Sequence, residues 1–160
     1  MNTKSKSVVL LIAVIGTLLF AVRALTQPAE VSPNQEKLLG SWDLQITAVG
    51  QGVVVPGLLT FGAEGNVIAD EAAAPTETSA HGNWISTDDG GAAYTFVGLF
   101  SGEDGTHAGK FKVVGTLQYD ADTDTWHGPF KIDVFDPDDQ AIVSDHGTFD
   151  LTRIMVESMS

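Results

Sequence analysis

Apolar and polar residues alternate along most of the chain that follows Leu39. Residues 107–119 illustrate this, since Phe111 and Val113 share one parity while Lys110 and Lys112 share the other. Successive side chains of a strand point to opposite faces, so the alternation is typical of strands with one buried face. The pattern predicts eight strands, over residues 40–48, 54–62, 66–71, 80–86, 92–101, 107–119, 125–135 and 141–154.

Short segments rich in Asp, Gly and Pro separate most of the predicted strands. Asp bonds its own backbone in turns and Gly supplies positive φ, so these segments predict tight hairpins and an antiparallel meander. An open sheet of this size would leave two exposed edges, which closure removes. The predicted fold is all-β: an eight-stranded antiparallel up-and-down barrel with a short N-terminal helical turn that starts near Ser32 and Pro33.

Two connections and one strand depart from this regular pattern. Residues 49–54 are glycine-rich and apolar, and residues 71–80 are long and of low complexity. Both are expected either as loops at a barrel mouth or as ordinary connections. Strand 92–101 is apolar on both faces, which predicts a cover over its outer side or a homo-oligomer contact.

Three of the four histidines occur in one short motif, His-Gly-x-aromatic, at His81, His127 and His146. The glycine and its ring also recur without histidine, and the full set is Gly40–Trp42, Gly82–Trp84, Gly98–Phe100, Gly109–Phe111, Gly128–Phe130 and Gly147–Phe149. Residues two apart on a strand share a face, so the glycine and ring should face inward and the histidine outward. We interpret these pairs as points where the strands bend, with the rings directed into the barrel.

The inward parity selects ten candidate ligand-binding residues. They are Trp42, Leu44, Phe61, Trp84, Tyr94, Phe96, Phe111, Tyr119, Phe130 and Phe149. Tyr94 and Tyr119 also offer hydroxyl groups that can orient a ligand or donate a proton. No residue is assigned a catalytic role, although an acid that faced inward, such as Asp145, would become a candidate.

The N-terminal segment is typical of an export signal. Lys4 and Lys6 precede an apolar run over residues 8–22, shorter than the roughly 20 residues of a membrane-spanning helix. Cleavage near Ala24 would give a secreted or periplasmic protein, whereas without cleavage the run would be a membrane anchor. We expect a signal peptide or anchor over residues 1–24, a linker and helical turn over 25–38, and the barrel domain over 39–155. The chain has no cysteine, which excludes a lipoprotein anchor and disulfides.

Charge and motifs narrow the possible functions. The net charge of −13 argues against a nucleic-acid partner and favours solubility. Phosphate-loop, dinucleotide and nucleophile-elbow motifs are missing from the sequence, so no cofactor is expected. Residues 120–124 have the alternating aspartates of a calcium loop, but Thr125 and Lys131 occupy the positions that require Gly and Glu, so no metal is expected. The adjacent residues 144–146 contain Ser, Asp and His, which cannot converge as a triad from one strand.

Two short segments carry a family resemblance. LLGSW at residues 38–42 resembles the opening Gly-x-Trp motif of the lipocalin and wider calycin families, and LTRI at 151–154 resembles their last strand. The resemblance implies that Arg153 packs across Trp42 and closes the barrel base, through a cation–π contact of roughly 1 kcal/mol. The chain also looks like uncharacterised bacterial lipocalin-like proteins in its HGNW, YTFVGLF and VFDPD stretches. It lacks the lipocalin helix after the last strand and the middle lipocalin motif.

A second resemblance leads to an alternative. Residues 98–117 are similar in style to the central hairpin of allene oxide cyclases and dirigent proteins, compact barrels that guide a reactive substrate without a cofactor. The expected function is an exported barrel that binds a small hydrophobic molecule in its interior. A cofactor-independent cyclase or isomerase and a structural or interaction module with a filled core are the alternatives. Whether the protein is an enzyme stays open.

Overall fold

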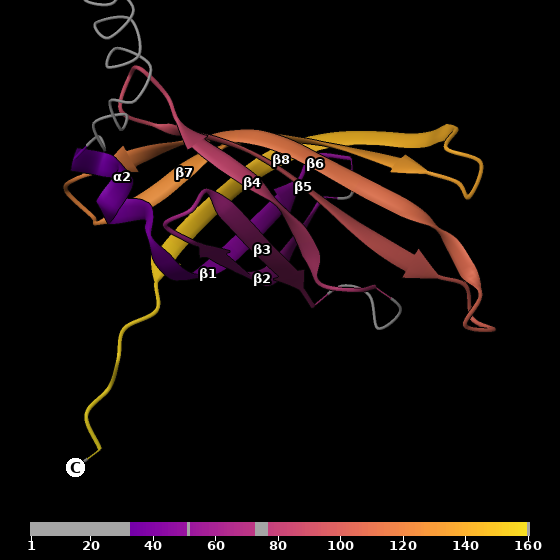
Figure 1. Cartoon of the computed structure of the whole chain (residues 1–160), viewed down its shortest axis with the longest axis horizontal. Helices are drawn as coiled ribbons and strands as arrows, with labels where there is room; N and C mark the ends of the chain where they lie inside the picture. The colour runs from indigo at the N-terminus through magenta and orange to yellow at the C-terminus, as the bar shows by residue number, and fades with distance from the viewer. Residues whose placement is uncertain (1–32, 51, 73–76, 160) are drawn as a thin grey trace, which may run out of the picture. The chain divides into compact units, whose positions relative to one another are not determined.

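The computed structural model of the chain describes residues 33–50, 52–72 and 77–159 (Figure 1). A short helix precedes eight strands, which form one closed barrel in sequence order. The elements are α2 Pro33–Leu38, β1 Gly40–Ala48, β2 Val53–Phe61, β3 Asn66–Glu71, β4 Ala80–Ser86, β5 Ala92–Ser101, β6 His107–Asp120, β7 Thr125–Phe135 and β8 Ala141–Arg153. The predicted eight-stranded antiparallel barrel and its helical turn are confirmed.

The predicted signal or anchor over residues 1–24 and most of the 25–38 linker lie outside the described residues. Within the described part of the chain, no helix has the length and apolar character needed to cross a membrane.

Every strand pairs antiparallel with its neighbour in sequence, and β1 pairs with β8 to complete the cylinder. Trp42 lies opposite Arg153 at one end of this last pairing, and Ala48 lies opposite Gly147 at the other. Closure removes the unpaired edges that an open meander of this size would expose.

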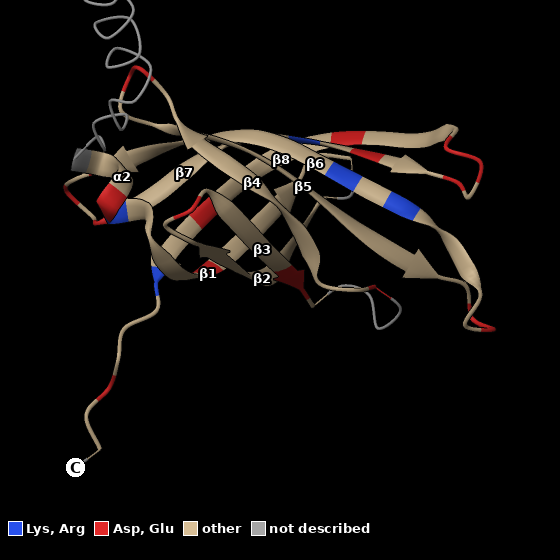
Figure 2. Cartoon of the chain, viewed as in Figure 1, with Lys and Arg blue, Asp and Glu red and all other residues tan. Residues whose placement is uncertain are grey.

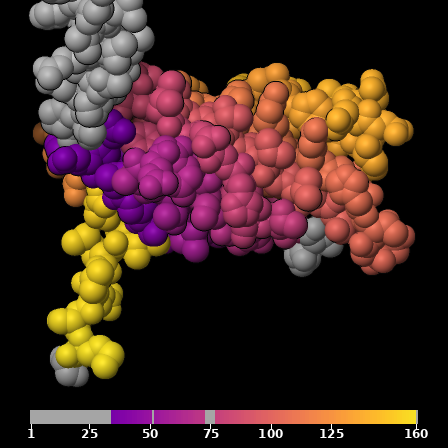
Figure 3. All heavy atoms as spheres, in the orientation of Figure 1, coloured from indigo at the N-terminus to yellow at the C-terminus, as the bar shows by residue number. Residues whose placement is uncertain are grey.

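The antiparallel order places the connections alternately at two ends of the barrel. One end, here called the base, holds α2 and the turns at residues 62–65, 87–91 and 121–124. The other end, here called the mouth, holds the connections 49–52, 72–79, 102–106 and 136–140. Figures 1 and 3 show α2 at one end and the 102–106 and 136–140 turns projecting at the other. The two unusual connections predicted at a barrel mouth therefore both join strands at the mouth.

The base half of the barrel is filled with side chains. Trp42 is fully buried, and its indole Nε1 donates a hydrogen bond to the Leu38 carbonyl at 2.8 Å. The Arg153 guanidinium lies 4.1 Å from the centre of the Trp42 ring and donates to the carbonyls of Leu39 and Lys37. Helix α2 and the Trp42–Arg153 end of the β1–β8 pairing thus plug the base. Other fully buried residues are Leu59, Phe61, Val67, Leu117, Trp126 and Leu151.

The glycines of the barrel interior lie opposite aromatic residues of the neighbouring strand. These cross-strand pairs are Gly82 with Phe96, Gly98 with Phe111, Gly109 with Phe100, Gly115 with Tyr94, Gly128 with Phe149 and Gly147 with Phe130. A Cβ atom at Gly147 would collide with the Thr47 carbonyl oxygen and come within 2.8 Å of the Phe130 ring. A ring of the neighbouring strand therefore covers four of these glycines, which are Gly98, Gly109, Gly115 and Gly147.

The histidines of the repeated motif point away from the interior. His81, His127 and His146 are exposed, while Gly128 and Gly147 beside them are buried. The parity prediction for these side chains is confirmed. On β5, the outward Leu99 is 47% exposed, and Ile85 of the adjacent β4 is 67% exposed.

Candidate functional site

The mouth half of the barrel contains a cavity of about 140 Å³. Its wall draws on all eight strands and on the 72–79 connection, with β4 contributing only its first residue, Ala80. The lining residues are Leu44, Ile46, Ala48, Val55, Ala69, Asp70, Glu71, Glu77, Thr78, Ala80, Phe96, Phe111, Val113, Phe130, Ile132, Asp145 and Phe149. Deep in the barrel the wall is made of hydrocarbon and rings, and the acidic residues all lie toward the mouth.

Five of the ten candidate ligand-binding residues line this cavity. They are Leu44, Phe96, Phe111, Phe130 and Phe149. The last three come from different strands and are brought together by the barrel, with the Phe130 and Phe149 ring centres 4.4 Å apart. Phe149 also stacks on Phe96 at 6.4 Å.

The other five candidates lie outside the cavity wall. Phe61 and Trp84 meet edge to face at 5.8 Å, and Trp42 belongs to the base plug. Tyr94 lies beneath the cavity, stacked at 5.8 Å on both Phe96 and Phe149. Tyr119 is partly exposed at the base, where its hydroxyl donates to Asp124 Oδ1 at 2.7 Å.

The Tyr94 hydroxyl is buried without a hydrogen-bond partner among the described residues. Burial raises the pKa of Tyr94 far above its usual value, so the phenol stays protonated at all physiological pH values.

Glu77 is the site residue that sequence reasoning missed. It lies in the low-complexity connection between β3 and β4, where alternation gives no indication of direction. Its backbone forms an isolated antiparallel bridge with Phe100. The next residue, Thr78, fixes the segment against β5, because its N–H donates to the Leu99 carbonyl at 2.9 Å and its hydroxyl accepts from the Leu99 N–H at 3.1 Å. These bonds hold Glu77 in the cavity wall.

The Glu77 carboxyl is in an unfavourable environment for a negative charge. Its Oε2 atom is buried and has no hydrogen-bond partner among the described residues. Burial, followed by the nearby Glu71 carboxyl, raises the pKa of Glu77 to about 7. The side chain therefore exchanges a proton near neutral pH.

Asp145 faces inward from β8, as the parity of that strand allows. Its side chain is 17% exposed and lines the cavity. The Asp145 Oδ1 atom accepts hydrogen bonds from the backbone N–H groups of Gly50 at 3.1 Å and His146 at 2.8 Å. The glycine at position 50 permits this approach, since a Cβ there would lie 2.6 Å from Asp145 Oδ2.

The basic residues of the described chain are elsewhere. They lie on α2, β6, β7 and the end of β8, while acidic residues cluster in the connections (Figure 2). Among the described residues, the cavity wall contains no Lys, Arg or His. Its charged lining is consequently entirely acidic.

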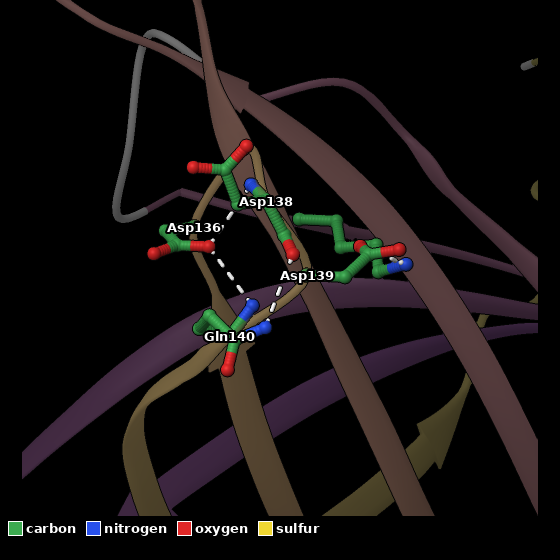
Figure 4. Close-up of polar contacts among 5 residues, drawn as sticks. Asp136, Asp138, Asp139 and Gln140 are labelled. Atoms are coloured by element: carbon green, nitrogen blue, oxygen red, sulfur yellow. Dashed lines mark hydrogen bonds and ion pairs between the residues drawn. The ribbon is translucent and has the colours of Figure 1, made fainter.

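Other groups of polar residues form turns and surface contacts. Ser144 donates to Asp133 Oδ1 at 2.9 Å on the outer surface, whereas Asp145 lines the cavity, so residues 144–146 do not form a triad. In the 136–140 turn, the Asp136 Oδ1 atom accepts the N–H groups of Asp138 and Gln140 (Figure 4). Within the described ranges, no set of three or more acidic or histidine side chains is placed to hold a metal ion.

No family model matches the chain, and no curated protein matches it.

Proposed function

We propose that this protein is an exported barrel that binds one small, largely apolar molecule in its mouth cavity. The observation that carries the proposal is the cavity itself, which the rings of Phe96, Phe130 and Phe149 line in the mouth half of the barrel. Burial of apolar ligand surface against such a wall contributes roughly 25 cal/mol per Å².

The volume indicates the size of the ligand. Drug-sized ligands use pockets of roughly 300 Å³ or more, whereas an engineered apolar cavity of about 150 Å³ in another protein binds benzene. The 140 Å³ cavity thus suits a molecule with one ring or a short branched chain. It also favours a binding protein over a module with a filled core.

The fold and the base plug support a place among lipocalin-like barrels. The contact of Arg153 with Trp42 at 4.1 Å agrees with what the two short motifs imply for that group. The N-terminal basic and apolar residues support export to a periplasmic or extracellular location, where such a carrier would meet its ligand.

Native mass spectrometry of the protein purified from its own source tests this proposal. We expect a fraction of the protein to carry one extra small molecule that is released on denaturation. Protein that carries no molecule, and that binds no one-ring compound from a screen, would contradict the proposal.

Glu77 supports a second candidate function, a cofactor-independent isomerase or cyclase. A carboxyl group with a pKa of about 7 at an apolar cavity is suited to general acid–base catalysis near neutral pH. The test compares the molecules released from the wild type and from Glu77→Gln by chromatography. An isomerase would leave unconverted substrate on the variant, with the same mass but a different retention time. A carrier would release the same molecule from both proteins.

A further inference from the structure

We propose that the mouth cavity selects a small apolar molecule that carries a protonated amine, with the ammonium group between Glu77 and Asp145. This inference rests on the proposed binding function and specifies its ligand class. A neutral hydrocarbon, an anionic amphiphile and a metal ion are the competing occupants, and each is disfavoured by a separate observation.

The distribution of chemical groups over the wall gives the ligand its polarity. Phe96, Phe130 and Phe149 form the deeper wall. Glu71 ends β3 at the mouth, Glu77 lies in the 72–79 connection, and Asp145 lies in the mouth half of β8. An amphipathic ligand would therefore place its hydrocarbon body against the rings and its polar group toward the mouth.

Glu77 provides an unfilled acceptor at the position where that polar group would lie. Its buried Oε2 atom lacks a partner among the described residues, and a buried acceptor left unpaired is unfavourable. An ammonium group supplies three donors and makes charge-assisted bonds to carboxylates. A neutral hydrocarbon would leave Oε2 unpaired.

Asp145 is a second acceptor in the same wall. Both of its hydrogen bonds to described residues reach Oδ1, from Gly50 and His146, which leaves Oδ2 without a partner among the described residues. The two backbone donors fix the carboxylate orientation before a ligand arrives. A pre-oriented acceptor reduces the entropy lost on binding.

The negative charge of the cavity wall disfavours anionic ligands such as fatty acids. A fatty-acid carboxylate would meet Glu71, Glu77 and Asp145, and the described part of the cavity wall has no basic side chain to pair with it. The net charge of −13 also raises the local concentration of cations and lowers that of anions.

The coordinating side chains available in the described cavity wall also disfavour a bare metal ion. Metal sites need several convergent ligands, and no group of three or more such side chains exists within the described residues. An organic cation needs fewer carboxylates because the rings bind its body, and the ring faces themselves attract cations.

Isothermal titration calorimetry with three compounds of the same body tests the proposal. Phenethylamine, 2-phenylethanol and 3-phenylpropanoate share a phenyl ring and a short chain but differ in charge. The titrations use the full chain with residues 1–24 unchanged and no fusion partner. They are done at pH 8, where Glu77 is mostly ionised. We expect phenethylamine to bind about tenfold more tightly than 2-phenylethanol, and 3-phenylpropanoate to bind most weakly.

Three variants assign the effect to the cavity. Glu77→Gln and Asp145→Asn should each reduce the affinity for phenethylamine about five- to tenfold and change that for 2-phenylethanol less than about twofold. Asp150→Asn is the matched control, because it removes the same charge from the exposed outer face of β8 and should change neither affinity.

The outcomes separate this inference from the function on which it rests. Equal binding of the amine and the alcohol, or tighter binding of 3-phenylpropanoate, overturns the amine preference and leaves apolar binding intact. Loss of amine affinity in Asp150→Asn equal to that in Glu77→Gln overturns it as well, since the effect would then come from net charge. Failure of all three compounds to bind overturns both the preference and the proposed function.

Discussion

Arg153 and Trp42 face each other across the pairing of the first and last strands, with the guanidinium 4.1 Å from the ring centre. The Arg153 Nη1 atom also donates to the Leu39 carbonyl at 3.0 Å, just before β1. One side chain thus stacks on the ring at the start of the barrel and satisfies backbone acceptors beside α2. We conclude that this contact closes the base.

The closure predicts a large difference between two kinds of substitution. Trp42→Ala should lower the free energy of unfolding by about 3–5 kcal/mol, because it empties a fully buried volume. Arg153→Ala should lower it by about 1–2 kcal/mol through loss of the ring contact and two hydrogen bonds. Urea denaturation measures both, with the exposed His127→Ala as control, expected within about 0.5 kcal/mol of the wild type. Equal and negligible losses in all three would refute the closure.

The glycine at position 147 should resist enlargement. Gly147→Ala puts a Cβ against the Thr47 carbonyl oxygen and the Phe130 ring, so β1 and β8 must separate. We expect a loss of about 1–3 kcal/mol in the free energy of unfolding, the usual cost of overpacking. Gly102→Ala is the matched control, since its new methyl would lie 3.1 Å from Asp104 Oδ1 and no closer than 3.8 Å to any other atom. A Gly147→Ala protein as stable as the control would show that the strands do not need this close approach.

Unlike Gly147→Ala, the conservative change Tyr94→Phe should not destabilise the protein. Its hydroxyl is buried and has no partner among the described residues, so Tyr94→Phe removes a desolvated polar group and keeps the stacked ring. The free energy of unfolding should stay equal or rise by up to about 1 kcal/mol. Thermal unfolding followed by circular dichroism measures this. A loss above about 1 kcal/mol would mean that the hydroxyl makes a bond that stabilises the fold.

Glu77 should make stability fall as the pH rises toward neutrality. The folded protein holds the Glu77 proton up to about pH 7, while the unfolded chain releases it near 4.5, so the folded state binds more protons between these values. Stability from this group is complete below pH 4.5 and is lost as the pH rises through 7. Because the side chain is partly exposed, the expected change is on the order of 1 kcal/mol.

Glu77→Gln isolates this effect from other titrating groups. The variant should be more stable than the wild type at pH 8 and similar to it at pH 5, because the amide cannot ionise. Glu71, Asp70 and Asp145 also line the cavity, and they are present in both proteins, so a difference at each pH comes from the change at position 77. Glu64→Gln makes the same chemical change in an exposed turn of the base and should show no such pH dependence. A constant difference between Glu77→Gln and the wild type from pH 5 to 8 would contradict the raised pKa.

The fold could be predicted almost completely from alternation, because each strand has one buried face and each turn has its own Asp or Gly signal. The outward direction of His127 and His146 followed from the same parity. The cavity could not be located in this way. Parity places both Trp42 and Phe149 on the inner face. The packing of α2 against the base decides that Trp42 belongs to the plug, whereas Phe149 lines the cavity.

Glu77 shows a second limit of sequence reasoning. Its connection has neither alternation nor a turn motif, and its place in the cavity wall comes from the hydrogen bonds of Thr78 to β5. Such contacts between segments some 20 residues apart leave no periodic signal. Parity allowed an inward direction for Asp145, but its place in a cavity wall depends on packing that alternation does not indicate.

The central claim, that the mouth cavity binds a small apolar molecule, is tested most directly by blocking it. Ala48→Phe fills the cavity from β1, and Ala93→Phe adds the same ring to β5 outside the cavity wall. Calorimetric titration with 2-phenylethanol should give saturable binding to the wild type and to Ala93→Phe, and at least tenfold weaker binding to Ala48→Phe. Binding that is equal in all three proteins, or missing from the wild type, would contradict the claim.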